Sequence, residues 1–467
     1  MPSDASTDPA LNKLTMRLAE FAAGLTFAKL PAEVREQAKL IARDSLGNQI
    51  AASAISEAGI KIVQQATEWG GKPEATVIGF GAKLPSPMAA LCNGTLGHGV
   101  ELDDAHGSGL IKAGSLLVPS AFIAAELTHA SGQDTLAALV AGYEIAVRIA
   151  KAINPGHRQR GYHTTSSVGT IGSAVIVAKM LGCDAETIAC AIGLAAMHSA
   201  GLQAYLDDPC MAKPLGPGRA AFNGMLSGVM ASRGFTGPKT ALESREGFLR
   251  GVTDQVNSAE FGGLGERFVI MEVGFKPHSA CRYAHGPLDI AQYFYREGVR
   301  IPEIANVDVH MSALAIRQAS KPKSSNLNVA MGSTQFGVAL ALARGSNGLL
   351  DYWRGFEDKS VHAAAEKINL IADPAYGLGG RQSMITLSLK DGRVLTQSQE
   401  EPRGEPANPL SAAQLEAKFL ATAGLVLADE QVAAISTRVM ALEREPDAGA
   451  IPPLTVVPEA KPKLRAA

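Results

Sequence analysis

The chain has 467 residues, 46% hydrophobic and 19% charged, which is the balance of a large globular protein with room for two or three domains. Its formal net charge of -2 gives no basic field of the kind that nucleic-acid-binding proteins present. The 5 cysteines form no CxxC pair, which argues against a disulfide framework or a structural zinc site and indicates a reducing, cytoplasmic compartment.

Neither a signal peptide nor a membrane span is expected. The opening residues, MPSDASTDPALNK, lack a charged region followed by an apolar stretch. Apolar runs such as Ile171–Leu181 are interrupted by small or charged residues and are too short to cross a bilayer. We therefore expect a cytoplasmic protein that binds neither nucleic acid nor membrane.

The first half of the chain is predicted to be helical. Pro31 stands at a helix start with acids in the first turn, and apolar residues recur at Val34, Ala38, Ile41 and Leu46. Short β-like character is confined to residues 74–80, and a basic loop is predicted over residues 154–161. Further helices are predicted over residues 11–25, 60–69, 87–98, 114–131, 135–153, 162–181, 185–201 and 220–232.

The pattern changes after about residue 265. Strands are predicted over residues 268–273 and 307–312, and SMITLSLK followed by Asp391-Gly392 predicts a hairpin. Helices are predicted between these strands, over residues 287–297 and 334–343. Helical patterning returns at residue 408, with a serine cap and apolar spacing.

The fold class predicted from this order is mainly α with an inserted α+β domain. Both chain ends, residues 1–265 and 401–467, would form a large helical domain that ends in a tail. Residues 266–400 would form a smaller lid domain.

An acidic cluster with a histidine, Glu101, Asp103, Asp104 and His106, is the first candidate site. Carboxylates this close repel one another, so one can hold a raised pKa and serve in proton transfer. The alternative is helix capping and surface solvation. No HExxH, DxDxDG or similar spacing appears, so no metal site is predicted.

The second candidate is His163, in the stretch GYHTTSSVGTIG. Small hydroxyl and glycine residues before a helix leave backbone N–H groups available to an anion, and an imidazole there can transfer a proton near neutral pH. The alternative is a packed histidine beside a glycine-rich helix contact. The glycines do not follow a strand with GxGxxG spacing, so no dinucleotide site is expected.

Two later stretches concentrate cations. Lys213 and Arg219 lie around a Pro/Gly turn ahead of a helix, where a lysine can face a carboxylate or enolate oxygen. Lys276, Arg282 and His285 lie in one short segment, where an arginine can hold a carboxylate bidentately. The alternative for both stretches is a loop with solvated cations.

These stretches, in this order, resemble the MmgE/PrpD family, whose members include 2-methylcitrate dehydratase, cis-aconitate decarboxylase and iminodisuccinate epimerase. The resemblance covers nearly the whole chain. It is carried by NGTLGHGVELDDAH, GYHTTSSVGTIGSA, KPLGPGRAAFNGMLSGVMASRGFTGP, KPHSACRYAH and EEPRGEPANPLSAAQLEAKF.

The resemblance implies a helical domain built from both termini, an inserted α+β lid, a homodimer, and catalysis without a metal or an organic cofactor. It also implies an active cleft between the two domains. The residues that would line this cleft are Glu101, Asp103, Asp104, His163, Lys213, Lys276, Arg282 and His285.

The chain departs from the family's pattern at four positions. Lys112 stands where members that handle citrate-like acids usually carry the histidine of a His-Pro-Gly/Ser stretch, and Gly216 stands where they often carry a histidine. Aspartate is common at the position of Glu101, and threonine at that of Ala105. His106 is the candidate that could compensate for the replaced imidazole.

The leading hypothesis is a cofactor-free lyase of the dehydratase type that acts on a small polycarboxylate or hydroxy acid. His163 would be the general acid or base, and the opposing group would come from Lys112, Glu101, Asp103 or His106. The substrate would be bound by Lys213, Lys276, Arg282, His285 and Asp104. The alternatives are an epimerase or isomerase, a decarboxylase, and a non-catalytic dimeric binding protein of the same fold.

Overall fold

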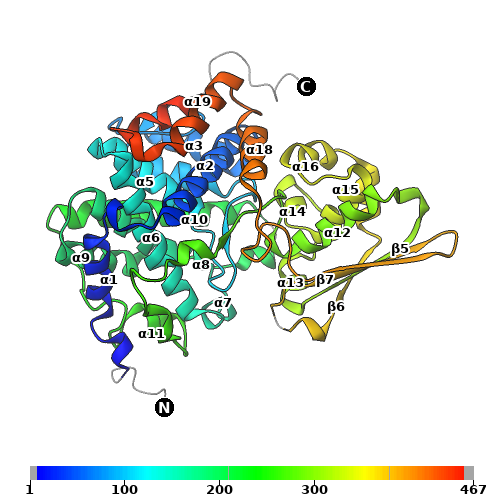
Figure 1. Ribbon diagram of the computed structural model, residues 1–467, viewed down its shortest axis with the longest axis horizontal. Coiled ribbons are helices and arrows are strands. Elements are labelled where there is room, and N and C mark those ends of the chain that lie inside the picture. The colour runs from blue at the N-terminus through cyan, green and yellow to red at the C-terminus, as the bar shows by residue number, and fades with distance from the viewer. Residues whose placement is uncertain (1–7, 209, 378, 457–467) are drawn as a thin grey trace. The chain divides into compact units, whose positions relative to one another are not determined.

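The computed structural model describes residues 8–208, 210–377 and 379–456, which form two compact units (Figure 1). The described part of unit 1 comprises residues 8–99, 103–273 and 415–456, and unit 2 comprises residues 100–102 and 274–414. The chain thus divides after residues 273 and 414, whereas the sequence placed the changes of character near residues 265 and 400. The predicted tail beyond residue 456 lies outside the described residues.

Unit 1 is helical, with three two-residue strands, β1 (Ala75–Thr76), β2 (Lys83–Leu84) and β3 (Ala105–His106), among its described residues. One helix, α18 (Ala412–Ala423), begins in unit 2 and continues in unit 1 from residue 415. The helices are α1 (Leu14–Gly24), α2 (Ala32–Ile55), α3 (Glu57–Trp69), α4 (Ser86–Gly97), α5 (Gly114–Thr128), α6 (Gly132–Ile153), α7 (Gly156–Gln159), α8 (Thr164–Met180), α9 (Ala185–His198), α10 (Ala212–Ser232), α11 (Phe248–Val252), α18 (Ala412–Ala423) and α19 (Asp429–Met440).

Two helix starts that the sequence predicted are confirmed. Pro31 directly precedes α2, where its missing N–H costs no hydrogen bond and Glu33 lies in the first turn. Ser411 precedes α18, and its Oγ accepts a hydrogen bond from the N–H of Gln414 at 3.2 Å. Both signals are local, which is why the sequence alone was sufficient to place them.

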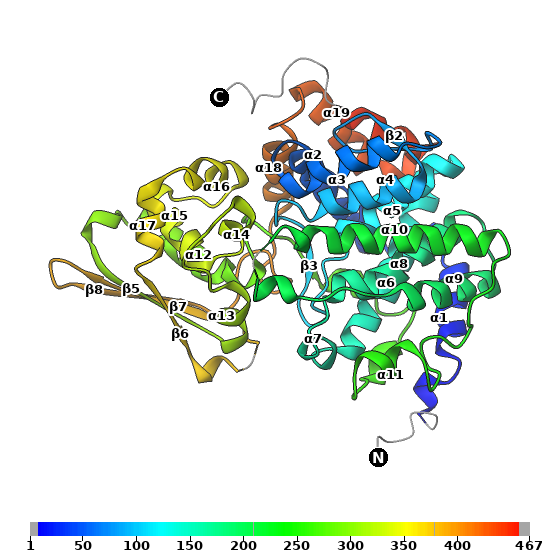
Figure 2. The ribbon, with the colours of Figure 1, turned by 180° about the vertical axis from the view of Figure 1, so that it is seen from behind.

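The core of unit 1 is a group of tightly packed helices. α8 packs against α5, α6, α9 and α10, and α10 packs against α4 as well (Figure 2). Almost all of α8 is buried because small and apolar residues follow one another around the whole helix. This arrangement fixes the positions of the starts of α8 and α10, which carry the candidate site.

The predicted turn around Lys213–Arg219 is wrong, because these residues form the first half of α10. Pro214 lies in the first helical turn, where backbone N–H groups have no intrahelical acceptor, so the absence of its N–H removes no hydrogen bond. Pro217 lies inside the helix and removes one intrahelical hydrogen bond. Close packing favours the helix nevertheless: a Cβ at Gly218 would lie 2.1 Å from Oγ1 of Thr95 in α4. Tertiary packing here overrides local propensity.

Unit 2 combines helices with a four-stranded sheet, and the predicted fold class, mainly α with an α+β portion, is confirmed. The strand order is β6-β5-β7-β8, with β5 parallel to β6 and antiparallel to β7. The elements are α12 (His285–Arg296), β5 (Ile304–Met311), α13 (Ala313–Ala319), α14 (Leu327–Met331), α15 (Thr334–Arg344), α16 (Leu349–Phe356), α17 (Lys359–Ala365), β6 (Ile368–Ala372), β7 (Ser383–Leu389) and β8 (Val394–Gln399).

The sheet of unit 2 has one covered face. Buried and half-buried residues alternate along β7, as expected for a strand with one face against a core. α12 packs on β7 and β8, and α15 packs on α12 (Figure 1). The predicted hairpin is confirmed, because β7 and β8 pair antiparallel with Ser388 opposite Val394. The predicted strand over residues 307–312 is found as β5.

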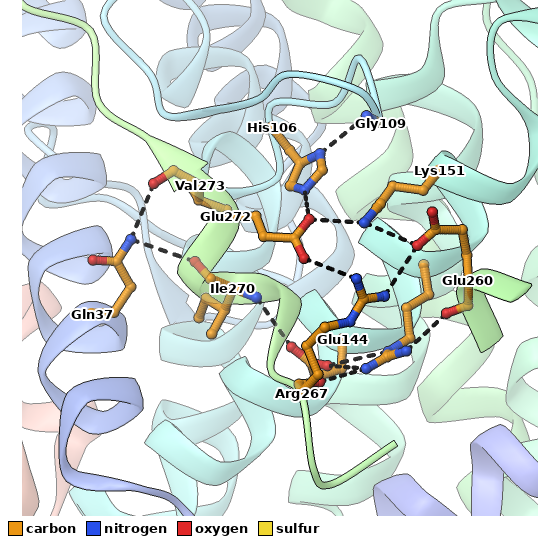
Figure 3. A network of polar contacts seen from close by, with 11 residues as sticks. Gln37, His106, Gly109, Glu144, Lys151, Glu260, Arg267, Ile270, Glu272 and Val273 are labelled. Carbon is orange, nitrogen blue, oxygen red and sulfur yellow. Dashed lines mark hydrogen bonds and ion pairs between the residues drawn. The ribbon is translucent and has the colours of Figure 1, made fainter. Parts of the chain in front are cut away.

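The strand predicted over residues 268–273 is wrong. Val269–Glu272 forms a 3-10 turn, and a strand, β4 (Val273–Gly274), follows at the boundary of the units. Within the 3-10 turn, the N–H and the carbonyl of Ile270 both bond to side chains. The N–H of Ile270 donates to Oε1 of Glu144 at 3.1 Å, and Nε2 of Gln37 donates to the carbonyl of Val273 at 3.2 Å (Figure 3).

The basic loop predicted over residues 154–161 is also partly wrong. Gly156–Gln159 forms the short helix α7, and both His157 and Arg158 are buried. Burial lowers the pKa of His157 to about 4, so this imidazole is neutral near pH 7. A charged, solvated loop is therefore not what these residues form.

None of the helices in the described part of the chain combines the length and the hydropathy that a membrane span requires.

Candidate functional site

A half-open cavity of about 220 Å³ lies in unit 1, among the start of α8, the end of α9, the segment that follows α9, and the first half of α10. Its wall carries two histidines, a lysine, an arginine, a tyrosine and an asparagine. The residues that line it are His163, Ser166, His198, Ala200, Gly201, Leu202, Tyr205, Ala212, Lys213, Leu215, Gly216, Arg219, Ala220 and Asn223.

His163 is held at the start of α8 by its main chain and by its ring. It has an extended conformation and precedes the first helical residue, and its N–H donates to the carbonyl of Gly201 at 2.9 Å. Nδ1 of the ring lies 2.7 Å from Oγ of Ser166, and the ring meets Tyr205 edge-on with 5.9 Å between centroids. Only 4% of His163 is exposed. The cavity therefore contains a firmly oriented imidazole.

A buried aspartate–histidine pair lies next to His163. Oδ2 of Asp103 is 2.6 Å from Nδ1 of His98, at the end of α4, and both side chains are buried. The His98 ring lies 6.0 Å from the His163 ring between centroids, with 40° between the planes. A carboxylate can fix the tautomer and orientation of an imidazole in this way. The pair thus borders the cavity histidine without being part of the cavity wall.

Lys213 and Arg219 supply the positive charge of the cavity. Both lie in α10 and line the cavity, Lys213 half-buried and Arg219 exposed. An ammonium and a guanidinium in one cavity favour an anionic ligand, and a guanidinium can hold a carboxylate with two parallel hydrogen bonds. His163 and Lys213, which the sequence placed in one site, are brought together by the structure.

Asp104 anchors the start of α5. Its Oδ1 accepts from the N–H of Gly114 at 2.9 Å, and its Oδ2 accepts from the hydroxyl of Tyr143 at 2.8 Å. Burial raises the pKa of Asp104 to about 7, and the nearby carboxylates of Asp103 and Asp44 add to this effect. A raised carboxyl pKa was predicted for the acidic cluster, and Asp104 has it, although Asp104 does not line the described cavity.

His106 is buried and belongs to an ionic network of unit 1 (Figure 3). Nδ1 of its ring accepts from the N–H of Gly109 at 3.0 Å, so Nε2 carries the proton that is donated to Oε2 of Glu272 at 3.1 Å. Nζ of Lys151 lies 2.8 Å from the same Glu272 and 2.9 Å from Glu260. The hydrogen bond from His106, together with Lys151, lowers the pKa of Glu272 to about 2.

The same network includes a fully buried arginine. Arg148 faces Glu144 at 3.3 Å and donates to the carbonyls of Glu260 and Gly262 at 2.8 and 2.6 Å. Burial raises the pKa of Glu144 to about 7. The network ties α6 to the segment over residues 260–272, and protein groups occupy both nitrogens of His106.

Lys112 is half-buried and is fixed through its main chain. Its N–H donates to Oγ1 of Thr165 at 3.1 Å, and its carbonyl accepts from Oγ of Ser115 at 2.7 Å. Thr165 lies in the first turn of α8, two positions after His163. The residue that departs from the family's pattern is therefore attached to the helix that presents the cavity histidine.

The acidic cluster is divided between the units. Glu101 belongs to unit 2, and Asp103 and Asp104 belong to unit 1. Glu101 adopts a left-handed conformation, with φ 54, which is uncommon for a residue other than glycine. Nζ of Lys276, fully buried, donates to the carbonyl of Glu101 at 3.0 Å and lies 3.3 Å from its Oε2. These two predicted site residues thus form an ion pair within unit 2.

Arg282 and His285 are buried in unit 2. Arg282 forms a bidentate ion pair with Glu405, at 2.7 and 2.6 Å. Nε2 of His285 donates to the carbonyl of Ala280 at 3.2 Å, and burial holds the pKa of His285 well below its usual value. Bidentate pairing by an arginine was predicted for this segment, and the carboxylate it holds here belongs to the protein itself. Substrate binding by Arg282 and His285 stays a prediction.

Sequence reasoning missed several residues around the cavity. His98 lies inside the quoted motif NGTLGHGVELDDAH, but its pairing with Asp103 requires a turn between them that no spacing rule predicts. His198 and Asn223 come together because α9 and α10 are neighbours; Nδ2 of Asn223 donates to the carbonyl of His198 at 3.3 Å. Tyr205 offered no local signal.

Within the described ranges, no group of three or more His, Cys, Asp or Glu residues is arranged to hold a metal ion. Metal-independent and cofactor-independent catalysis stays a prediction.

Comparison with known proteins connects the whole chain to one family. The model of the MmgE/PrpD N-terminal domain matches residues 16–260, and that of the MmgE/PrpD C-terminal domain matches residues 278–443. The chain is 25% identical to a cis-aconitate decarboxylase of Aspergillus terreus, with 96% of each chain covered. It is 26% identical to a cis-aconitate decarboxylase of Mus musculus, with 93% of this chain and 91% of the relative covered.

Proposed function

Because the chain belongs to the MmgE/PrpD family, we propose that it is a lyase that acts on a small carboxylate substrate in the cavity of unit 1. One observation carries the proposal. His163, oriented by Ser166 and bordered by the His98–Asp103 pair, lines the same cavity as Lys213 and Arg219. A proton-transfer group and carboxylate-binding cations are the components that such a reaction needs.

The chemistry follows from placing a substrate carboxylate against Lys213 and Arg219. In a decarboxylation, the bond between carbon and the departing carboxylate breaks, CO₂ leaves, and the electron pair stays on the carbon. A neighbouring conjugated group delocalises this charge, which the cations stabilise. Protonated His163 then delivers a proton to the carbon. In a dehydration, neutral His163 removes a proton from carbon, and the departing hydroxyl takes a proton from a second acid, for which Lys112 is the candidate, and leaves as water.

Decarboxylation is the first reaction to test, since the relatives of Aspergillus terreus and Mus musculus carry the name cis-aconitate decarboxylase. Dehydration remains the second candidate, because the main chain of Lys112 is bonded to the first turn of α8, which brings an amine-bearing residue near the helix of His163. Epimerisation would use the same proton transfer without loss of a group. Catalytic roles for Glu101, Asp103 and His106, a homodimer and a cytoplasmic location stay predictions.

The test is a substrate screen in deuterated water followed by NMR. The panel contains cis-aconitate, citrate, 2-methylcitrate and malate. It also contains dicarboxylates derived from L-aspartate and from D-aspartate. We expect one acid either to lose CO₂ with deuterium incorporated at the protonated carbon or to lose water to give an alkene. The His163→Gln variant, purified identically, controls for contaminating enzymes. Absence of turnover or exchange with every acid would overturn the proposal in favour of a binding protein of the same fold.

A further inference from the structure

The side chain of Ser166 occupies an unusual position beside the cavity. It lies in the first turn of α8, is 4% exposed, and its Oγ is 2.7 Å from Nδ1 of His163. The main-chain N–H of Ser166 also bonds to the carbonyl of His163, at 2.9 Å. The hydroxyl and the imidazole are therefore held together by both the helix start and a side-chain hydrogen bond.

The space for this hydroxyl is left by two glycines from other parts of the chain. A Cβ built on Gly216 of α10 would lie 2.2 Å from Oγ of Ser166 and 3.2 Å from Nδ1 of His163. A Cβ built on Gly201 would lie 2.4 Å from Cβ of Ser166, and Gly201 also has a φ of +130, which other residues rarely adopt. A side chain at position 216 or 201 would thus displace Ser166.

The main chain around Gly201 supports the same arrangement. The carbonyl of Gly201 accepts from the N–H of His163 at 2.9 Å, and the N–H of Gln203 donates to the carbonyl of Gly161 at 2.8 Å. Gly201 therefore fixes the backbone of His163 and leaves room for the residue that contacts its ring. The positive φ of Gly201 and the space beside Ser166 both require a residue without a side chain at this position.

We propose that Ser166 is a positioning residue for His163, and that Gly201 and Gly216 are needed because they leave the space that its hydroxyl occupies. The bond to Ser166 restricts rotation of the ring and sets which nitrogen is turned toward the serine. A ring that rotates freely loses the alignment that proton transfer to a bound substrate needs. The consequence for turnover rests on the proposed function, whereas the hydrogen bond itself can be tested without a substrate.

The test is a double-variant cycle on the whole chain with Ser166→Ala, Gly216→Ala and the combined variant. The ring nitrogens of ¹⁵N-histidine-labelled protein are observed by NMR, with His163 assigned through His163→Gln. Ser166→Ala removes the hydroxyl and should move the Nδ1 resonance of His163 more than that of any other histidine. Gly216→Ala should move it as well, because the new methyl group displaces the hydroxyl.

The combined variant separates this account from general damage. Without the hydroxyl the methyl group at position 216 loses its 2.2 Å clash and keeps only its 3.2 Å approach to Nδ1 of His163. The combined variant should therefore differ from Ser166→Ala in its His163 resonances much less than Gly216→Ala differs from the wild type. Gly224→Ala is the matched control: in the same helix, its Cβ would lie 2.4 Å from Cβ of Ser173 in α8. This substitution introduces a steric clash between α10 and α8 at a place distant from Ser166 in both helices. It should therefore leave the His163 resonances unchanged.

Unchanged His163 resonances in Ser166→Ala would overturn the proposal, as would an effect of Gly216→Ala that persists in full without the hydroxyl. If Gly216→Ala does not fold, Ser166→Ala alone decides, since it only removes an atom. With a substrate in hand, Ser166→Ala should lower kcat roughly tenfold at nearly unchanged KM, the effect of one orienting hydrogen bond. Shifted resonances without turnover of any acid would refute the proposed function and leave the positioning role intact.

Discussion

Two histidines of unit 1 lie in opposite kinds of surroundings. His163 lines a half-open cavity together with Lys213, and its ring contacts the hydroxyl of Ser166 and the rings of His98 and Tyr205. Both ring nitrogens of His106 form hydrogen bonds within the protein, one with the N–H of Gly109 and the other with the carboxylate of Glu272 (Figure 3). In the sequence both were candidate site residues, His106 in an acidic cluster and His163 among glycine and hydroxyl residues. We infer from this difference that access to a cavity, more than the local density of charge, distinguishes the proposed reactive histidine from one that supports the fold.

The buried scaffold should respond most strongly to loss of its central arginine. Arg148→Met leaves the Glu144 carboxylate and the carbonyls of Glu260 and Gly262 without their donor in a fully buried place. Breaking a buried pair from one side costs about 3–5 kcal/mol. We expect a loss of this size in urea unfolding of the whole protein. A loss below about 1 kcal/mol would mean that the network is not structural.

Asp104 gives the scaffold a pH dependence. Burial raises its pKa from 3.8 to about 7, so the native state holds the proton more tightly than the unfolded chain does. The free energy of unfolding should therefore fall as pH rises from about 4 to about 7. Asp104→Asn removes this titration.

The free energy of unfolding of Asp104→Asn minus that of the wild type should increase by about 2–4 kcal/mol as the pH rises from about 4 to about 8. Urea unfolding at a series of pH values measures the difference. A constant difference across this range would show that Asp104 titrates normally in the native state.

On the cavity side, Lys213→Met should weaken substrate binding. Loss of a charge that contacts a carboxylate should raise KM about 10–100-fold, with a smaller effect on kcat. Lys61→Met is the control, because Lys61 is an exposed lysine of α3 that does not line the cavity. Steady-state kinetics on the acid found by the screen measure both. An unchanged KM in Lys213→Met would place carboxylate binding elsewhere.

The smallest effect is expected at Glu272. The hydrogen bond from His106, with Lys151, lowers its pKa from 4.5 to about 2, so this contribution to stability is complete above about pH 4.5 and is lost as pH falls toward 2. The side chain is 34% exposed, and solvent screening reduces the contribution to about 1 kcal/mol. Glu272→Gln should lose this amount at neutral pH and nothing below about pH 2. An equal loss at both would indicate packing instead of charge.

The sequence was sufficient for features that depend on neighbouring residues. Pro31 and Ser411 mark helix starts through local chemistry, and Asp391-Gly392 between alternating residues marks the hairpin of β7 and β8. The helix α2 also follows from the spacing of its apolar residues, because Val34, Ala38, Ile41 and Leu46 are all buried. The first half of α10 was not predicted as a helix, because Pro217 and the neighbouring glycines favour a turn. The helix is explained only by its packing against α4, which the sequence does not reveal.

The site was predictable only in part, for a related reason. His163 and Lys213 were identified through motifs, and the structure places them in one cavity. The partners that decide what each polar residue does come from distant parts of the chain. Arg282 meets Glu405, and Glu272 meets His106, across more than a hundred residues each. No local pattern encodes such pairings.

The most direct test of the central claim compares His163→Gln with His106→Gln in deuterated water, using the acid that the wild type converts. NMR follows both product formation and deuterium at the protonated carbon. The account predicts that His163→Gln loses at least about 100-fold in rate, whereas His106→Gln, though less stable, stays within about fivefold of the wild type. The reverse order, or equal losses in two folded variants, would contradict the assignment of the cavity as the reactive site.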